Sequence, residues 1–179
     1  MNINKLIEDA EAGDMKAQSS LAYFYIDGDG VPQDYEKAFY WVKKAAVQGC
    51  IYSEYNLGYL HWSGKGTLED YEKAFFWFSL AAEKGHAKAQ NYLGAMYSSG
   101  RGVDENFEEA FIWLSIAAKQ NHPNAQCRLA LMYINGNGVP ESLSEAAHWA
   151  NLAYMQGSEF AAEMIDEYEL WDYIHTPKI

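Results

Sequence analysis

The chain has 179 residues, about half of them apolar and 16% aromatic, and 13 Lys and Arg against 25 Asp and Glu give a formal net charge of −12. This apolar content excludes an intrinsically disordered chain, and a chain of this length can bury a core without disulfide or metal support. The few scattered cations argue against nucleic acid or an anionic membrane as partner, because either needs Lys and Arg gathered on one face.

The chain opens with MNINKLIEDA, which lacks an apolar run and already carries Glu8 and Asp9. We therefore expect no signal peptide, and no later stretch approaches the roughly 18–20 apolar residues of a transmembrane helix. A cytoplasmic location is the resulting expectation. Residues 2–12 are predicted to form a capping helix, with Leu6 and Ala10 on its apolar side and polar residues such as Lys5 on its outer side.

From residue 14 the sequence repeats every 36 residues without an insertion. The repeated residues include a leucine (Leu21, Leu57, Leu93, Leu129), a tryptophan (Trp41, Trp77, Trp113, Trp149) and an alanine (Ala38, Ala74, Ala110, Ala146). A period of roughly 20–50 residues is typical of solenoids, propellers or arrays. Full repeats are therefore predicted at 14–49, 50–85, 86–121 and 122–157.

Each repeat is predicted to be a helix–turn–helix. In the first repeat, Ala17, Leu21 and Phe24 have helical spacing, and a Gly-x-Gly sequence beginning at Gly28 ends the helix. The second helices are predicted to begin after four good N-cap residues, Asp34, Asp70, Asn106 and Ser142. Small residues always follow the repeated leucine, which indicates close approach of the paired helix; they are Ala22, Gly58, Gly94 and Ala130.

After the fourth repeat, residues 158–172 align with a first helix and are predicted to form a second capping helix. Asp166 and Glu169 replace residues that would meet a partner helix, which gives this cap a polar outer face. The predicted fold is all-α: a solenoid of antiparallel helix pairs in one domain over 1–175, with four full repeats between two half-repeat helices.

The recurring residues resemble the Sel1-like repeat, a relative of the tetratricopeptide repeat. In the first repeat the resemblance is carried by Ala17-Gln18, Leu21-Ala22, Tyr25, Gly28-Asp29-Gly30-Val31, Asp34-Tyr35, Lys37-Ala38, Trp41 and Lys44-Ala45-Ala46-Val47-Gln48-Gly49. The resemblance implies a right-handed superhelix whose first helices line the concave face. It also implies an adaptor that binds proteins or peptides, with no catalytic residue common to the family.

The predicted concave face is unusually aromatic and ends in an acidic segment. Exposed Tyr and Trp often anchor protein interfaces. The candidate partner-binding residues are Tyr23, Tyr52, Tyr55, Tyr59, Trp62, Lys88, Asn91, Arg128, Leu131, Glu163, Glu167 and Trp171. The alternative is that the tyrosines pack between neighbouring first helices. Alanine at Tyr55, Tyr59 and Trp62 distinguishes the two, because binding loss without unfolding favours a binding surface.

Neither a catalytic site nor a metal or cofactor site is predicted. The Lys65 loop lacks the glycine spacing of a phosphate loop, and the Asp27 loop lacks the ligands of a calcium loop. The histidines do not cluster, and His61 is expected to be a packed core residue. Cys50 and Cys127 lie two repeats apart, too far for a disulfide bond in this geometry.

The leading expectation is therefore a non-catalytic adaptor or regulator that binds a protein or peptide with basic and apolar or aromatic residues. The alternative is an immunity-type inhibitor of a cationic toxin or effector, a role of some proteins with this repeat. A β-lactam-binding or β-lactam-hydrolysing protein comes third, because the chain lacks the paired cysteines of such members. Self-association through exposed aromatic residues stays open.

Overall fold

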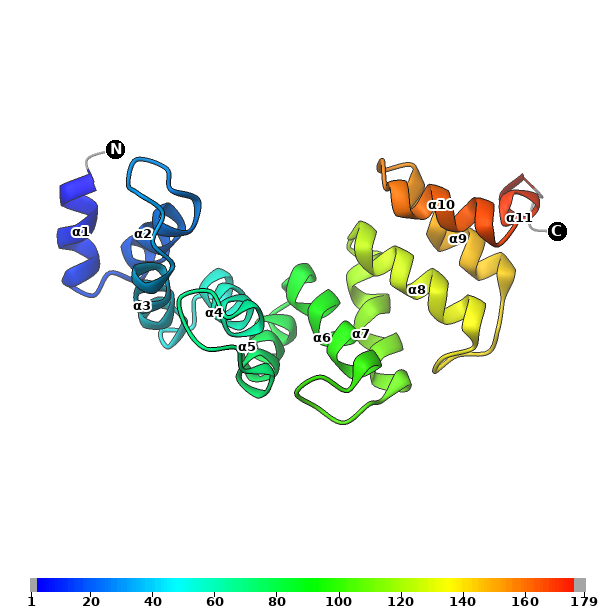
Figure 1. Cartoon of the computed structure of the whole chain (residues 1–179), viewed down its shortest axis with the longest axis horizontal. Coiled ribbons are helices and arrows are strands. Elements are labelled where there is room, and N and C mark those ends of the chain that lie inside the picture. The colour runs from blue at the N-terminus through cyan, green and yellow to red at the C-terminus, as the bar shows by residue number, and fades with distance from the viewer. Residues whose placement is uncertain (1–2, 176–179) are drawn as a thin grey trace. The chain divides into compact units, whose positions relative to one another are not determined.

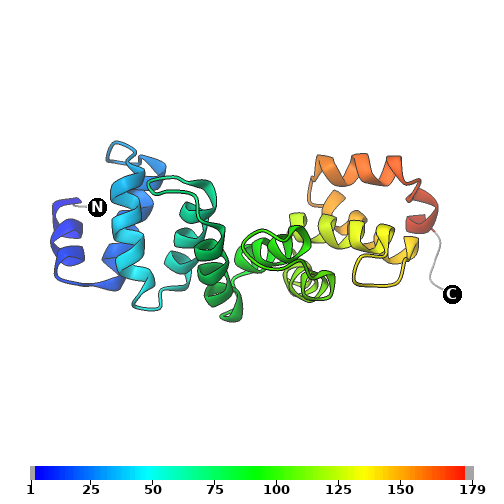
Figure 2. The same ribbon diagram turned by 60° about the horizontal axis from the view of Figure 1, so that its bottom comes forward.

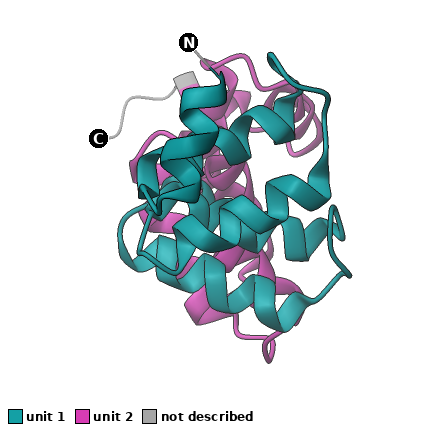
Figure 3. Ribbon diagram, turned by 90° about the vertical axis from the view of Figure 1, so that its left-hand side faces the viewer, with its two compact units in different colours: residues 1–89 teal, residues 90–179 magenta. Residues whose placement is uncertain are grey.

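The structure is a computed structural model that describes residues 3–175, and every regular element in that range is a helix (Figure 1). The chain divides into two compact units, residues 1–89 and 90–179 (Figure 3). The first unit contains α1 (Ile3–Glu11), α2 (Met15–Asp27), α3 (Tyr35–Ala46), α4 (Ile51–Ser63) and α5 (Tyr71–Glu83). The division falls within α6 (Ala87–Ser99). The second unit contains α7 (Phe107–Lys119), α8 (Pro123–Asn135), α9 (Leu143–Tyr154), α10 (Glu159–Glu167) and α11 (Trp171–His175).

The all-helical repeat fold is confirmed. In the first unit α2 packs on α3 and α4 on α5, and in the second α8 packs on α9. The repeated leucines are at most 1% exposed, and the repeated alanines from Ala38 to Ala146 are fully buried. These residues form the core between paired helices.

The single domain over 1–175 remains a prediction. No helix among residues 3–175 is both long and apolar enough to cross a bilayer.

The predicted N-caps are confirmed at all four second helices. The side chain of Asp34 accepts a hydrogen bond from the Lys37 amide, and Asp70, Asn106 and Ser142 do the same in their repeats. The backbone amide of Asp34 also donates to the carbonyl oxygen of Tyr25 at 2.9 Å, a bond repeated from Asp70 to His61. The cap therefore fixes the start of the second helix and ties it to the first.

The small residue after each leucine is explained by helix packing. A Cβ atom at Gly58 would lie 2.7 Å from Cδ1 of Phe78, and one at Gly94 would lie 2.6 Å from Cγ of Leu114. Such distances are well inside van der Waals contact. Any larger side chain would push α4 from α5, or the second half of α6 from α7.

The second glycine of the inter-helix loop serves contact between repeats. Gly66 lies so close to the start of α3 that a Cβ atom would collide with the carbonyl oxygen of Tyr35, and Gly138 meets Phe107 in the same way. Figure 2 shows the loop after α4 reaching the start of α3. By contrast, a Cβ atom at Gly30, in the first full repeat, would meet no other described residue within 4 Å.

A further contact, within each helix pair, recurs at 30-residue spacing. Amide side chains hydrogen bond between Gln18 and Gln48 at 2.8 Å, and two equivalent pairs, Gln90–Gln120 and Gln126–Gln156, lie at 2.6 and 2.8 Å. In the second repeat Glu54 and Lys84 replace the amides, with 2.5 Å between Nζ and Oε1. One buried polar position thus uses two chemistries in one chain.

The N-terminal cap matches its prediction within the described residues. Lys5 is exposed, Leu6 is half-buried and Ala10 is fully buried. Residue 2, the first of the predicted capping helix, falls outside the described residues.

The C-terminal cap requires a correction, because residues 158–172 do not form one helix. Helix α10 ends at Glu167, and Glu169 has a positive φ of 53°. The amide of Leu170 then donates to the carbonyl oxygen of Ile165 at 2.9 Å, and Leu170 is fully buried. The break brings the apolar side chain of Leu170 onto the core of the second unit.

Candidate functional site

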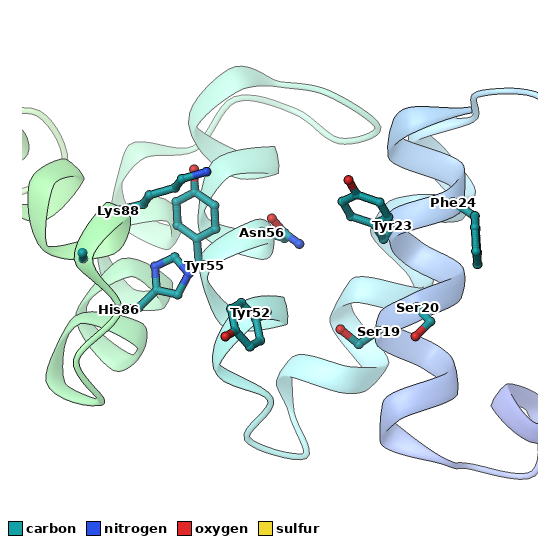
Figure 4. A pocket seen from close by; sticks show the side chains of 10 residues that line it. Ser19, Ser20, Tyr23, Phe24, Tyr52, Tyr55, Asn56, His86 and Lys88 are labelled. Atoms are coloured by element: carbon teal, nitrogen blue, oxygen red, sulfur yellow. The ribbon is translucent and has the colours of Figure 1, made fainter. Parts of the chain in front are cut away.

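A cleft of the first unit lies on its first-helix face, which we define as the surface of α2, α4 and the start of α6. Its volume is about 620 Å³. It is lined by Ser19, Ser20, Tyr23, Phe24, Tyr52, Tyr55, Asn56, His86, Ala87 and Lys88. Figure 4 shows α2 on one side, with Tyr23 directed toward Asn56, and α4 with the start of α6 on the other. We call this the unit 1 cleft.

Small side chains hold α2 and α4 together beside the cleft. The hydroxyl of Ser53 donates to Oγ of Ser19 at 3.0 Å, and the thiol of Cys50 donates to the same oxygen at 3.6 Å. Tyr23 lies one helical turn after Ser19, and Tyr52 lies next to Ser53 in the sequence; the two residues remain 55% and 70% exposed. The small residues let α2 and α4 approach closely, and the exposed Tyr23 and Tyr52 rings beside this contact form the walls of the cleft.

His86 completes the wall nearest α6. Its ring stacks on Tyr55 with centroids 4.6 Å apart and contacts Tyr52 edge-on at 5.7 Å. Its Nδ1 accepts a hydrogen bond from the Ala89 amide at 3.3 Å, so a neutral imidazole carries its proton on Nε2. The helical spacing of the candidate residues does not single out His86, which precedes α6. The signal that could have found it is its position 31 residues after Tyr55, the spacing that also joins Ser19 to Cys50.

The cleft is lined with hydrogen-bond donors rather than carboxylates. Among the described residues that line the cleft, Lys88 is the only charged one, although the chain carries 25 Asp and Glu. Near the rim, hydrogen bonding to the Asp27 carboxylate holds the pKa of Tyr23 above its usual value, so Tyr23 stays protonated at neutral pH.

The structure separates the predicted aromatic residues into two groups. Tyr23, Tyr52 and Tyr55 line the unit 1 cleft together with Lys88. Tyr59 and Trp62 do not line it, and both are half-buried. The Trp62 ring packs edge-on against Tyr71 with centroids 5.0 Å apart, and Lys65 lies 5.8 Å from the Tyr59 ring centre. The Trp62 ring therefore packs on the second helix of its own repeat, not on a neighbouring first helix.

The predicted residues of the second unit are divided as well. Asn91 is only 6% exposed, which removes its side chain from the accessible surface. Arg128 and Leu131 line a smaller cavity of about 270 Å³ with Asn124, Cys127 and Phe160. Glu163 and Glu167 are exposed on α10. Trp171 donates to the Asp166 carboxylate at 2.5 Å and packs edge-on against Tyr154.

This smaller cavity uses the same repeat positions as the unit 1 cleft. Cys127, Arg128 and Leu131 lie three periods, 108 residues, after Ser19, Ser20 and Tyr23, and Phe160 bears the same relation to Tyr52. A hollow between successive first helices is therefore a property of the repeat. The aromatic and donor-rich lining belongs to the first unit.

The remaining reactive residues do not form a second site. Each cysteine has a serine neighbour, Ser19 for Cys50 and Ser158 for Cys127, at 3.6 Å between sulfur and oxygen. Burial raises the pKa of the Cys127 thiol, which disfavours the nucleophilic thiolate. His61 is packed edge-on against Phe39 and is 7% exposed, as expected. Among residues 3–175, no three His, Cys, Asp or Glu side chains gather as a metal site would require.

Known proteins similar to the chain share this repeat. A crystal structure of c5321, a protective antigen of uropathogenic Escherichia coli with an SLR fold, is 34% identical with a TM-score of 0.87, over 92% of this chain and 35% of that one. A Sel1 repeat protein from Oxalobacter formigenes is 30% identical with a TM-score of 0.83, over 90% of this chain and 67% of that one. The chain thus spans about a third of the first protein's length.

A more distant structure shows the fold alone. The immunity protein Pa5087 from Pseudomonas aeruginosa is 21% identical with a TM-score of 0.57, over 98% of this chain and 67% of that one. No curated protein sequence matches the chain.

The Sel1 repeat model matches four consecutive segments, residues 16–50, 51–86, 87–122 and 123–158. The bounds of these four segments differ by at most two residues from the repeat bounds predicted from the sequence. The chain belongs to the Sel1 repeat family.

Proposed function

We propose that the chain is a non-catalytic adaptor or regulator that binds a protein or peptide in the unit 1 cleft. The Sel1 repeat family supports a role in protein interaction. The observation that carries the proposal is the pair of exposed rings, Tyr23 and Tyr52, beside a cleft of about 620 Å³. Large aromatic side chains beside a hollow are typical anchors for a partner's apolar side chain.

The charge of the chain favours a partner that also carries Lys or Arg. The net charge of −12 attracts cationic proteins over a distance of about a Debye length, and Glu163 and Glu167 present exposed carboxylates on α10. This attraction affects the rate of encounter more than the final affinity. The unit 1 cleft then supplies the apolar contacts that hold the complex.

The experiment is affinity capture from a lysate of the source organism with three baits, after circular dichroism has shown that all are folded. The first bait is the wild-type chain, and the second carries Tyr23→Ala and Tyr52→Ala. The control bait carries Tyr40→Ala and Phe76→Ala, which remove two rings of similar exposure, 50% and 54%, from the second helices α3 and α5.

We expect the wild-type and control baits to recover the same protein and the Tyr23→Ala/Tyr52→Ala bait to lose it. Equal recovery by the cleft variant, with loss from the control, would place binding on the second helices. That result would contradict the proposal.

The acidic face of α10 supports a second candidate, an immunity-type inhibitor of a cationic toxin. Coexpression with a toxin encoded beside the gene tests it by cell survival. The wild-type chain should protect the cells, and Glu163→Gln/Glu167→Gln should slow association with the toxin and reduce its dependence on salt. Cell death with the wild-type chain present would reject this candidate.

A further inference from the structure

We infer that the unit 1 cleft recognises a short peptide segment in which an Asp or Glu side chain lies beside an aromatic or other large apolar side chain. The inference rests on the proposed function and names the chemistry of the bound segment. The net charge of −12 alone would suggest a basic ligand, whereas the charged residue that lines the cleft is the cation Lys88.

The first argument is charge complementarity inside the cleft. Within the part of the chain that the structure describes, the lining contains one ammonium group, Lys88, and neither Asp nor Glu. The lysines Lys37, Lys73 and Lys84 each pair with a carboxylate of this chain, at 3.2, 2.7 and 2.5 Å. Among residues 3–175, Lys88 makes no such ion pair. Its charge is therefore available to a carboxylate brought by a partner.

The second argument is the orientation of the polar groups. Nδ1 of His86 accepts a hydrogen bond from the Ala89 amide at 3.3 Å, so its lone pair is not offered to a donor on a ligand. The Ser19 oxygen accepts from both Ser53 and Cys50, so its own hydrogen is the remaining one to donate. A cleft with the Ser19 hydroxyl as donor and Lys88 as cation favours an acceptor with negative charge.

The third argument is the position of the rings. Tyr55 stacks on His86 beside Lys88, while Tyr23 lies across the cleft on α2 (Figure 4). One peptide segment that crosses from α6 to α2 would place a carboxylate near Lys88 and an apolar side chain between the tyrosines. The stated pairing of an acidic and an apolar residue follows from this arrangement.

The experiment is selection of displayed random dodecapeptides, flanked by fixed residues so that only side-chain carboxylates vary, on the immobilised full chain. Selections use the wild type, Lys88→Glu, Lys16→Glu and Tyr23→Ala/Tyr52→Ala. Lys16 is the matched control, because it occupies the same repeat position 72 residues earlier, is also exposed in the first turn of its helix and does not line the cleft.

We expect the wild type and Lys16→Glu to enrich peptides with Asp or Glu beside Phe, Tyr, Trp or Leu, and Lys88→Glu to lose that enrichment. A synthetic peptide of the consensus should bind Lys88→Glu roughly tenfold more weakly or worse, the effect of losing one charge-assisted hydrogen bond. Its affinity for Lys16→Glu should stay within about twofold, because solvent screens that charge.

Enrichment of basic and aromatic peptides that survives Lys88→Glu but is lost in Tyr23→Ala/Tyr52→Ala would overturn this inference and leave the proposed function standing. Failure of the wild type to enrich any peptide, or enrichment unaffected by the tyrosine changes, would overturn both. Circular dichroism and the unfolding midpoint of each variant establish that lost enrichment reports the surface rather than unfolding.

Discussion

Glu54 and Lys84 show how one repeat position accepts two chemistries. The Glu54 side chain is 3% exposed, and that of Lys84 is 39% exposed. Lys84→Gln leaves a buried carboxylate opposite an amide and should lower the free energy of unfolding by about 3 kcal/mol. Adding Glu54→Gln recreates the Gln–Gln pair of the other repeats and should recover most of that loss. Urea unfolding of both single variants and the double variant measures the coupling, and additive losses would contradict this account.

His61 makes stability depend on pH. Burial, with further contributions from Lys73 and Lys43 against the opposing charge of Asp70, lowers the pKa of His61 below its usual value. The unfolded chain therefore binds a proton more readily than the folded one, and stability is lost as the pH falls below about 6.5. His61→Tyr restores the tyrosine found at this position in the other repeats. Its unfolding midpoint should fall less than that of the wild type between pH 7 and 5, whereas parallel midpoints would contradict the assignment.

At the level of elements, Gly30 and Gly66 occupy equivalent positions in two inter-helix loops and share a backbone conformation, but their surroundings differ. Gly30 and Gly66 have φ of 72° and 69°, so alanine at either pays the left-handed backbone cost of roughly 1–2 kcal/mol. Only Gly66→Ala also collides with the backbone of Tyr35, which should cost a further 1–3 kcal/mol or so. Thermal unfolding of the two variants compares them directly. Equal melting temperatures would show that the loop contact adds nothing.

The same elements show what a period can predict. Helix starts followed from N-cap residues such as Asp34 and Asn106, because a cap acts through its own hydrogen bonds. The break after α10 was missed, because it depends on the burial of Leu170 against the core and on a left-handed Glu169. Neither requirement has a counterpart in the full repeats from which the alignment was drawn.

For the whole molecule, the candidate site was only partly predictable. Helical spacing placed Tyr23 and Tyr52 on the first-helix face, and both line the unit 1 cleft. The same spacing did not distinguish Trp62, whose ring packs on Tyr71 of the following helix. The spacing also gave no reason to include His86, which lines the cleft from the turn just before α6. Periodicity gives the face of a helix, whereas the hollow depends on the volume of side chains from neighbouring repeats.

The most direct test of the binding account is amide hydrogen exchange of the intact chain, with and without the protein recovered by the wild-type bait. Exchange should slow in residues 19–24, 52–56 and 86–88, the three segments that line the unit 1 cleft, and stay unchanged in α3 and α5. Slower exchange confined to α3 and α5, or to the second unit, with those three segments unaffected, would contradict the central claim.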